Sequence, residues 1–240
     1  MKTNQSTVLV TGANRGIGKA FVEGFLAQGA RKIYAAARKR SDLDAIVALD
    51  PKRIVPLVLD VTKPEQVEAA AKVAADVNLL INNAGVATFG TATEISQADL
   101  KKDLEVNYFG LIQVTQAFVP VIEKNGGGGI ANVLSVVSLV GFPSIAGYSA
   151  SKAAAWSFTQ SLRADVAKRH IKVFSIYPGP IDTDMAKDFP MDKTPPSHVA
   201  QEVIQGIEKG AEDIFPDPMS KQFYAAWKAD HKAAEKQFAG

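Results

Sequence analysis

A tyrosine and a lysine stand four positions apart in the run Tyr148-Ser-Ala-Ser-Lys152. On a helix, residues at this spacing share one face, so the phenol and the ammonium would lie side by side. A phenol can give or take a proton, and a cation at about 4 Å lowers the pKa of that phenol towards neutrality. The spacing alone is a weak signal because Tyr224 and Lys228 repeat it, and we interpret that second pair as a surface pair.

Glycines follow the first predicted strand, in the run Thr11-Gly-Ala-Asn-Arg-Gly-Ile-Gly18. Glycine permits positive φ and lets a pyrophosphate approach the backbone closely. The helix that begins there presents free N–H groups and the positive end of its dipole to an anion. This context favours a dinucleotide site over a tight strand–helix turn alone, which stays the alternative. The predicted contacts are Gly12, Asn14, Arg15, Gly16, Ile17 and Gly18.

The end of the second predicted strand indicates which dinucleotide would bind. A site for NAD(H) usually carries an acidic residue about 20 positions beyond the glycines, whereas a nearby arginine suits the 2′-phosphate of NADP(H). Ala37 and Arg38 occupy this place, and no carboxylate does. Arg38 and Arg15 could clamp a phosphate through charge-assisted hydrogen bonds. We therefore expect NADP(H) in preference to NAD(H), with a solvated basic turn as the alternative.

Motifs in a fixed order from Thr11 to Thr183 make the chain similar to the short-chain dehydrogenase/reductase family. After the glycine run come the N-N-A-G sequence that ends at Gly85, a serine 13 residues before Tyr148, and the P-G-x-I-x-T sequence that ends at Thr183. The resemblance implies that Ile181 and Thr183 hold the nicotinamide carboxamide. Together with these two, the cofactor-binding residues that the resemblance implies are Asp60, Val61, Asn83, Ala84, Gly85, Tyr148, Lys152 and Pro178.

The resemblance also implies roles at the reacting centre. Hydride addition to a carbonyl builds an alkoxide, so a proton donor must lie close to it. Tyr148 would be the general acid in reduction and the general base in oxidation, and Ser135 would polarise the substrate oxygen. Lys152 would reach the nicotinamide ribose, and Asn107 would hold a water that relays protons to Lys152. Ser138 is a rival to Ser135 for the serine role.

Short β-branched runs alternate with longer segments of helical period along the chain. Near-continuous apolar strands that alternate with helices indicate an α/β protein with one parallel sheet, covered by helices on both faces. Right-handed crossovers then predict a doubly wound sheet, the Rossmann fold. The predicted strands are 6–11, 32–36, 54–59, 78–82, 130–135 and 171–177. The predicted helices are 16–28, 42–49, 64–76, 100–124 and 151–169.

The motifs run without a break, so we expect a single domain over residues 1–240. The proline-rich stretch Asp184–Ser197 has no clear period and suits a substrate loop, with a plain surface excursion as the alternative. A last helix over about 219–238 would close the chain. The predicted pocket residues are apolar and favour a hydrophobic ketone or aldehyde over a sugar. They are Phe89, Val137, Phe142, Pro143, Pro180, Met185 and Phe189.

The composition narrows the classes of function. Of 240 residues, 47% are hydrophobic and 22% are charged, which is typical of a globular protein and excludes a disordered tail. A net charge of +2 gives no reason to expect a nucleic-acid partner. There is no cysteine and the three histidines are scattered, so thiolate chemistry is excluded and no metal is expected. No stretch approaches a membrane span or a signal peptide, so we expect a soluble cytoplasmic protein.

These patterns together predict an NADP(H)-dependent oxidoreductase of the alcohol dehydrogenase or carbonyl reductase type. One alternative is a 3-oxoacyl thioester reductase of the same family, although those members usually end in a strand after a D-G-G-like turn that this chain lacks. A second alternative is a non-catalytic NADP(H) sensor, although such proteins typically lose the active-site Tyr or Lys. The resemblance implies a homo-oligomer, a dimer in preference to a tetramer, because the helices of Asn107 and Tyr148 commonly form a family dimer face.

Overall fold

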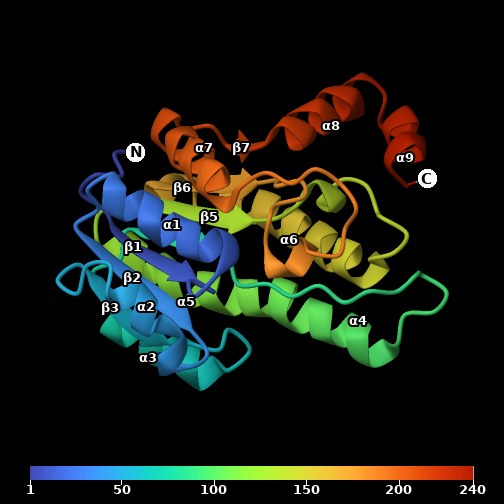
Figure 1. Cartoon of the computed structure of the whole chain (residues 1–240). Coiled ribbons are helices and arrows are strands. Elements are labelled where there is room, and N and C mark those ends of the chain that lie inside the picture. The colour runs from blue at the N-terminus through green and yellow to red at the C-terminus, as the bar shows by residue number, and fades with distance from the viewer. Residues whose placement is uncertain (240) are drawn as a thin grey trace.

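The computed structural model describes residues 1–239, whose strands form a seven-stranded sheet in the order β3-β2-β1-β4-β5-β6-β7 (Figure 1). Every neighbouring pair is parallel, which confirms the predicted doubly wound sheet. The strand order reverses between β1 and β4, and such a switch point opens a crevice at the carboxyl ends of the strands. The strands are β1 (Thr7–Thr11), β2 (Lys32–Ala37), β3 (Ile54–Val58), β4 (Leu79–Asn82), β5 (Gly128–Val133), β6 (Ile171–Ile176) and β7 (Asp213–Ile214).

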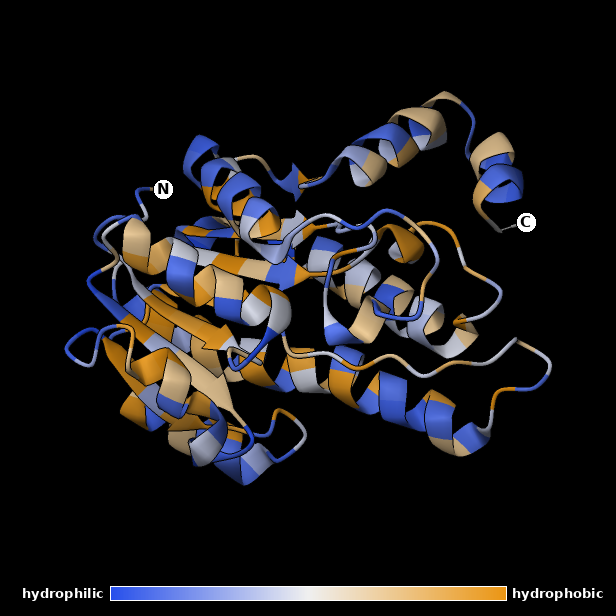
Figure 2. Ribbon diagram, in the orientation of Figure 1, coloured by the Kyte–Doolittle hydropathy of each residue, from blue (hydrophilic) through white to orange (hydrophobic). Residues whose placement is uncertain are grey.

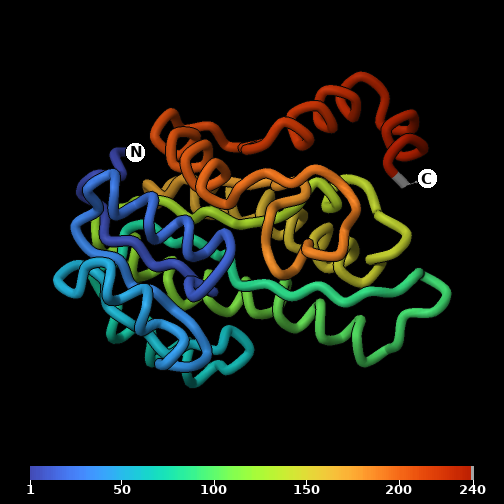
Figure 3. Tube along the Cα trace, in the orientation of Figure 1, coloured from blue at the N-terminus to red at the C-terminus, as the bar shows by residue number. Residues whose placement is uncertain are grey.

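The helices connect these strands and cover the sheet. They are α1 (Gly16–Ala27), α2 (Asp44–Val47), α3 (Pro64–Val73), α4 (Gln97–Leu104), α5 (Leu111–Lys124), α6 (Ala146–Asp165), α7 (Pro196–Lys209), α8 (Pro218–Ala229) and α9 (His231–Ala239). Shorter helical turns are η1 (Arg40–Leu43), η2 (Glu105–Gly110), η3 (Val136–Ser138), η4 (Ala167–Arg169) and η5 (Asp184–Ala186). The strand arrows in Figure 1 point towards one end of the sheet, and α4, α8 and α9 extend beyond that end, as the tube in Figure 3 also shows.

The two-residue period of the strands divides the core into two layers. Val8 and Val10 of β1 pack with Phe21 in the cluster beneath α1 and α7, whereas Leu9 packs with Phe118 in the cluster beneath α3 and α5. All five side chains are fully buried. The apolar strands between the helices are visible in Figure 2. The first layer supports the glycine loop at the start of α1, and the second supports α6.

The helix predicted over 100–124 is present, but it is not α-helical throughout. α4 ends at Leu104, and a π-helical turn, η2, leads into α5. Gly110 ends this turn, and a side chain there would come within 2.7 Å of the Cγ2 atom of Val61, so the turn packs tightly against the connection after β3. Hydropathy period does not distinguish an α-helix from one that holds a π turn, and the irregular turn falls where Asn107 lies.

The prediction of a single last helix over about 219–238 is wrong, because the structure has two helices there. It divides into α8 and α9 at Asp230, whose backbone is extended at φ −157°. The Asp230 carboxylate accepts hydrogen bonds from the N–H groups of Lys232 (2.9 Å) and Ala233 (3.0 Å), so it starts a new helix and ends the old one. Aspartate prefers this position because its side chain satisfies N–H groups that a helix start leaves free.

The predicted substrate loop 184–197 ends early, because Pro196 opens α7. Proline suits the first helical position, where its missing N–H costs nothing. The base of the loop is pinned: the N–H of Asp182 donates to the carbonyl of Thr194 (3.0 Å), and the N–H of Thr194 donates to the carbonyl of Pro180 (3.1 Å). Within the described chain, no helix has the length and apolarity to cross a membrane.

Candidate active site

A cleft of about 1360 Å³ opens at the carboxyl ends of the strands, between the glycine loop and α6. All the predicted cofactor-binding residues line it, and so does Ser135. The predicted residues that the structure brings together here are Gly12, Asn14, Arg15, Gly16, Ile17, Gly18, Arg38, Asp60, Val61, Asn83, Ala84, Gly85, Ser135, Tyr148, Lys152, Pro178, Ile181 and Thr183. Asn107 does not line the cleft and lies behind its wall.

The glycine loop has the shape that an anion site requires. Gly12 and Gly16 have positive φ values of 64° and 54°, which favour glycine. The N–H groups of Ile17 and Gly18 make no hydrogen bond to other described residues, and the first turn of α1 contains no acidic side chain. Gly18 serves packing, because a side chain there would lie 2.0 Å from the carbonyl oxygen of Gly12. The open backbone at this helix start fits a pyrophosphate.

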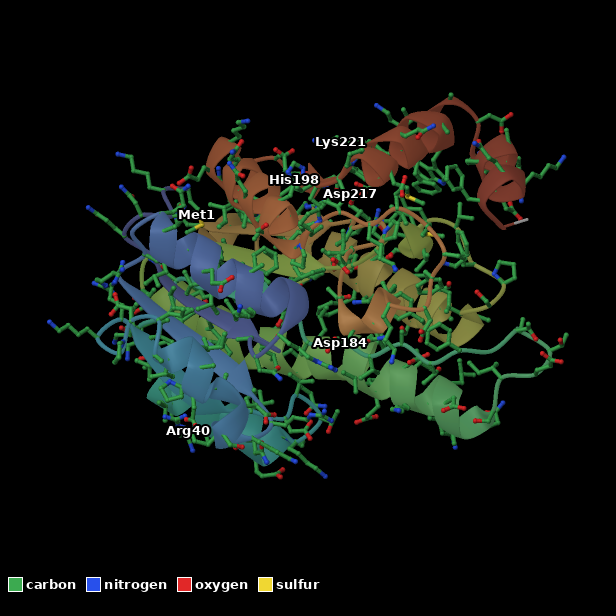
Figure 4. The ribbon with its side chains drawn as sticks, viewed as in Figure 1. Met1, Arg40, Asp184, His198, Asp217 and Lys221 are labelled. Atoms are coloured by element: carbon green, nitrogen blue, oxygen red, sulfur yellow. The ribbon has the colours of Figure 1, made fainter. Side chains whose placement is uncertain are left out.

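Two exposed arginines line the cleft, one within this loop and the other after β2. Arg38 follows β2, is exposed, and forms no ion pair within the described chain. Arg15 forms an exposed ion pair of 2.8 Å with Asp184, which begins the substrate loop. Asp184 is labelled in Figure 4, on the turn in front of the sheet.

Two consecutive asparagines brace the floor of the cleft. Asn82 donates to the side chains of Asn132 (2.9 Å) and Thr115 (3.0 Å), which ties β4 to β5 and α5. Asn83 lines the cleft, but its amide nitrogen donates to the carbonyl of Thr11 (2.9 Å). Its side chain therefore holds the strand end that leads into the glycine loop, a contact that the sequence does not reveal.

The catalytic candidates come from the ends of two adjacent elements. Tyr148 and Lys152 lie one turn apart at the start of α6, and the Lys152 Nζ atom is 5.6 Å from the centre of the Tyr148 ring. Lys152 is buried and donates to the carbonyl of Val133 (2.7 Å), the last residue of β5. Ser135 caps η3 through its Oγ atom, whereas its rival Ser138 accepts from the Ser135 N–H (3.2 Å) and so supports that turn.

The electrostatics of the pair differ from the expectation of a lowered Tyr148 pKa. Burial raises the pKa of Tyr148 to about 12, although a hydrogen bond with Ser135 opposes this. Burial also lowers the pKa of Lys152 to about 8, because the same dry environment disfavours the ammonium. Desolvation is therefore the largest influence on the pKa of both groups. Tyr148 is a neutral phenol at physiological pH, which is the form that donates a proton.

Asn107 lies in the π turn η2 and is almost fully buried. Its amide nitrogen donates to the Val86 carbonyl (2.8 Å) and to the Ser151 Oγ atom (2.9 Å). Its Oδ1 atom accepts from the Val86 N–H (2.9 Å). The side chain thus joins η2, the loop after β4 and α6, which leaves the predicted water relay a proposal.

A buried carboxylate near this site escaped the sequence analysis. Asp103, one turn before Asn107, accepts from the hydroxyl (2.6 Å) and the N–H (3.1 Å) of Thr88. Burial raises the pKa of Asp103, and its charge in turn raises the pKa of both Tyr148 and Lys152. The sequence feature that indicates such a residue is an acidic side chain on the inward face of a helix.

The substrate end of the cleft is apolar. Of the predicted pocket residues, Val137, Phe142, Pro180, Met185 and Phe189 line it, whereas Phe89 and Pro143 do not. Phe89 instead packs against Phe189 with its ring tilted, and the ring centres are 5.7 Å apart. Side chains that the sequence did not indicate complete the wall: Ile145, Ala186, Met191 and Met219. The described residues contain no group of three His, Asp or Glu placed to hold a metal ion.

Comparison with known proteins agrees with this geometry. The family model "short chain dehydrogenase" matches residues 6–194. 3-Oxoacyl-(acyl-carrier-protein) reductase FabG of Thermotoga maritima is 34% identical over 197 residues, covering 79% of this chain and 80% of its own. The chain therefore belongs to the short-chain dehydrogenase/reductase family of oxidoreductases.

Solved structures extend the likeness to the whole fold. A short-chain dehydrogenase from Burkholderia cenocepacia in complex with NADP is 37% identical, covers 100% of both chains and has a TM-score of 0.94. A protein from Burkholderia phymatum in complex with NAD is 24% identical with a TM-score of 0.86, covers 99% of this chain and 96% of its own, and shares the fold.

Proposed function

We propose that this protein is an NADP(H)-dependent oxidoreductase that interconverts a hydrophobic ketone or aldehyde and the corresponding alcohol. The observation that carries the proposal is the meeting of Tyr148, Ser135 and Lys152 at one end of the cleft, beside an apolar wall. Bound NADP(H) would supply or accept the hydride. The chain supplies the proton, the orientation of the substrate and the exclusion of water.

Each residue has a distinct task in carbonyl reduction. The neutral Tyr148 phenol donates its proton to the developing alkoxide, and Ser135 orients the substrate oxygen by a hydrogen bond. Lys152 holds its ammonium beside the ring and steadies the phenolate left behind. In alcohol oxidation the proton returns to Tyr148. Apolar side chains such as Phe142 and Phe189 exclude water from the reacting carbonyl.

NADP(H) is the preferred cofactor in this proposal. Arg38 stands free at the end of β2, where a 2′-phosphate would lie, and no carboxylate follows that strand directly. The NADP complex of the Burkholderia cenocepacia relative supports the choice. We also propose that the chain forms one domain and assembles as a homodimer. A cytoplasmic location is the third proposal, and the absence of cysteine accords with it.

Reduction of 3-oxoacyl thioesters is the second candidate, since FabG relatives are 34–35% identical to this chain. NADPH consumption tests both, with a panel of aromatic and aliphatic ketones and aldehydes, a sugar aldehyde and an acetoacetyl thioester. Turnover of hydrophobic carbonyls with the highest kcat/KM supports the proposal. A thioester preferred at least tenfold would favour the second candidate, and NADPH binding without turnover on any carbonyl would favour a sensor.

A further inference from the structure

Asp217 is a buried acid for which the proposed mechanism has no task. Its side chain is fully buried and forms no ion pair with any described residue. It lies where the chain passes from β7 into α8, as labelled in Figure 4. Burying a carboxylate is costly unless both of its oxygens are hydrogen-bonded. The partners of these two oxygens therefore indicate why aspartate occupies the position.

The two oxygens of Asp217 serve two different elements. Oδ1 accepts from the N–H of Ser220 (2.8 Å), which caps the start of α8. Oδ2 accepts from the N–H of Gly179 (2.8 Å), in the segment that follows β6 and lines the cleft. A serine or asparagine could cap α8 equally well. Only a carboxylate gives one acceptor to each of the two N–H groups.

The N–H of Gly179 belongs to the same peptide group as the Pro178 carbonyl. That carbonyl accepts from the N–H of Val136 (3.1 Å) and from the hydroxyl of Ser135 (3.3 Å). The peptide is thus held on both sides, by Asp217 at its nitrogen and by the Ser135 turn at its oxygen. A carboxylate on the N–H polarises the peptide and strengthens the carbonyl as an acceptor. When the Ser135 hydroxyl donates to a substrate oxygen instead, the Val136 N–H still anchors the Ser135 turn to the peptide that Asp217 holds.

Close packing joins the same two segments. A side chain at position 179 would come within 2.8 Å of Asp217 Oδ1 and 3.0 Å of the Met219 sulfur. Glycine at this position lets the start of α8 press against the segment after β6. Met219 itself lines the substrate end of the cleft.

The arm formed by α8 and α9 continues this wall. Phe223 of α8 is buried in a cluster with Val137, Phe142 and Phe189, all of which line the cleft. Phe238 of α9 packs edge-on against Phe223, with ring centres 4.9 Å apart. The α8–α9 arm thus contributes Met219 to the wall of the cleft and packs behind Val137, Phe142 and Phe189, and Asp217 is its polar attachment to the cleft.

We propose that Asp217 is a positioning residue of the active site, which fixes the Pro178–Gly179 peptide beneath Ser135 and seats the α8–α9 arm as a wall of the substrate pocket. The inference rests on the proposed function, since it assigns Asp217 to that site. It predicts that loss of the Oδ2 contact impairs turnover and substrate binding, whereas the adenosine end of the cofactor site is unaffected.

Asp217→Ser separates the two contacts, because the shorter side chain still caps α8 but does not reach Gly179. Asp217→Asn keeps the shape and offers one acceptor oxygen for the two N–H groups. Ser220→Ala is the matched control, since it removes the reciprocal bond of the Ser220 hydroxyl with the Asp217 N–H (3.2 Å) and leaves the Gly179 contact in place. Each variant is examined as the full chain, first for folding by thermal unfolding.

We expect Asp217→Ser to lower kcat about tenfold or more and to raise KM for a hydrophobic carbonyl several-fold, with the Kd for NADPH within about twofold of wild type. The kcat and KM of Asp217→Asn should lie between those of wild type and Asp217→Ser. Ser220→Ala should keep kcat within about twofold of wild type. Wild-type kcat and KM in a folded Asp217→Ser variant would overturn the inference, and so would equal losses in Ser220→Ala.

Amide hydrogen exchange gives a test that needs neither substrate nor cofactor. The Gly179 N–H should exchange at least about tenfold faster in Asp217→Ser than in wild type, and Ser220→Ala should leave its rate unchanged. An unchanged Gly179 rate in Asp217→Ser would refute the attachment itself. If wild type turns over no carbonyl while Gly179 loses protection as expected, the proposed function fails and the attachment stands.

Discussion

The chemistry at residue scale depends on how dry the Tyr148 environment is. Burial holds this phenol neutral and lowers the pKa of Lys152 to about 8, so most of the lysine stays charged at neutral pH. A neutral phenol beside a cation is ready to give up its proton once an alkoxide forms. The negative charge of the Asp103 carboxylate raises the pKa of both Tyr148 and Lys152.

Tyr148→Phe removes the proton donor and little else. We expect kcat for carbonyl reduction to fall by a factor of about 10²–10⁴, the usual contribution of general acid catalysis. The Kd for NADPH, measured by fluorescence titration, should stay within about threefold. Tyr224→Phe is the matched control, because Lys228 lies over the Tyr224 ring at 4.9 Å in the same four-residue spacing. Turnover retained in Tyr148→Phe would mean that another group donates the proton.

The Lys152 pKa predicts how stability changes with pH. The folded-state pKa lies below the ordinary value of 10.5, so between about pH 8 and 10.5 the unfolded chain binds more protons. Stability from this group therefore rises with pH through that window. The free energy of unfolding of wild type should rise relative to Lys152→Met by up to about 1.4 kcal/mol per pH unit.

Urea unfolding between about pH 8 and 9.5 measures this slope, below the range where the raised Tyr148 pKa acts in the opposite direction. Lys228→Met controls for the removal of a lysine elsewhere. A constant difference between wild type and Lys152→Met across these pH values would show that Lys152 keeps its ordinary pKa in the folded state.

At the scale of elements, an ion pair joins two segments that line the cleft. Arg15 from the glycine loop holds Asp184 from the substrate loop at 2.8 Å. If Arg15 binds the 2′-phosphate as proposed, Asp184 competes for it. An exposed pair contributes at most about 1 kcal/mol, which corresponds to roughly fivefold in affinity.

Asp184→Asn should therefore lower the Kd for NADPH two- to fivefold, and the gain for NADH should be at most half as large. Fluorescence titration of both cofactors against wild type and Asp184→Asn measures this. Arg15→Ala in the Asp184→Asn background should cancel the NADPH gain. Equal gains for both cofactors would assign the effect to general charge and remove Arg15 from the 2′-phosphate site.

The element boundaries show how much of the fold follows from sequence. Six strands fall within about two residues of their predicted ends because most of their residues are apolar and buried. β7 is two residues long and exists through its pairing with β6, so no local pattern marks it. α7 has buried Val199, Val203 and Ile207 at helical spacing, but Pro195 and Pro196 made its start resemble a loop.

As with the fold, the sequence predicts some residues of the candidate site and misses others. Motif residues such as Gly12, Tyr148 and Lys152 lie together because parallel strands end at one edge of the sheet. Asp103 and Asp217 were missed because each acts through partners distant in sequence, at Thr88 and Gly179. Residue type and spacing identify groups that do chemistry, whereas the groups that position them depend on tertiary contacts.

At the scale of the whole molecule, the cleft takes its walls from segments between Gly12 and Met219. A ligand bound there contacts both halves of the sheet and stabilises only the folded state. Stabilisation equals RT ln(1 + [L]/Kd), or about 2.7 kcal/mol at a concentration of 100 Kd. Thermal unfolding with NADPH or NADH therefore reports cofactor preference without a substrate, so the preference can be measured even while the carbonyl is unidentified.

Arg38→Ala should abolish most of the difference between the two cofactors. A hydrogen-bonded charge pair with phosphate contributes about 1.5–3 kcal/mol, so the Kd for NADPH should rise at least about tenfold. At the same NADPH concentration, stabilisation then falls to about 1.4 kcal/mol or less, while the NADH value is unchanged. Arg40→Ala is the control, because Asp44 already engages that guanidinium. Equal NADPH stabilisation of wild type and Arg38→Ala would show that the 2′-phosphate lies elsewhere.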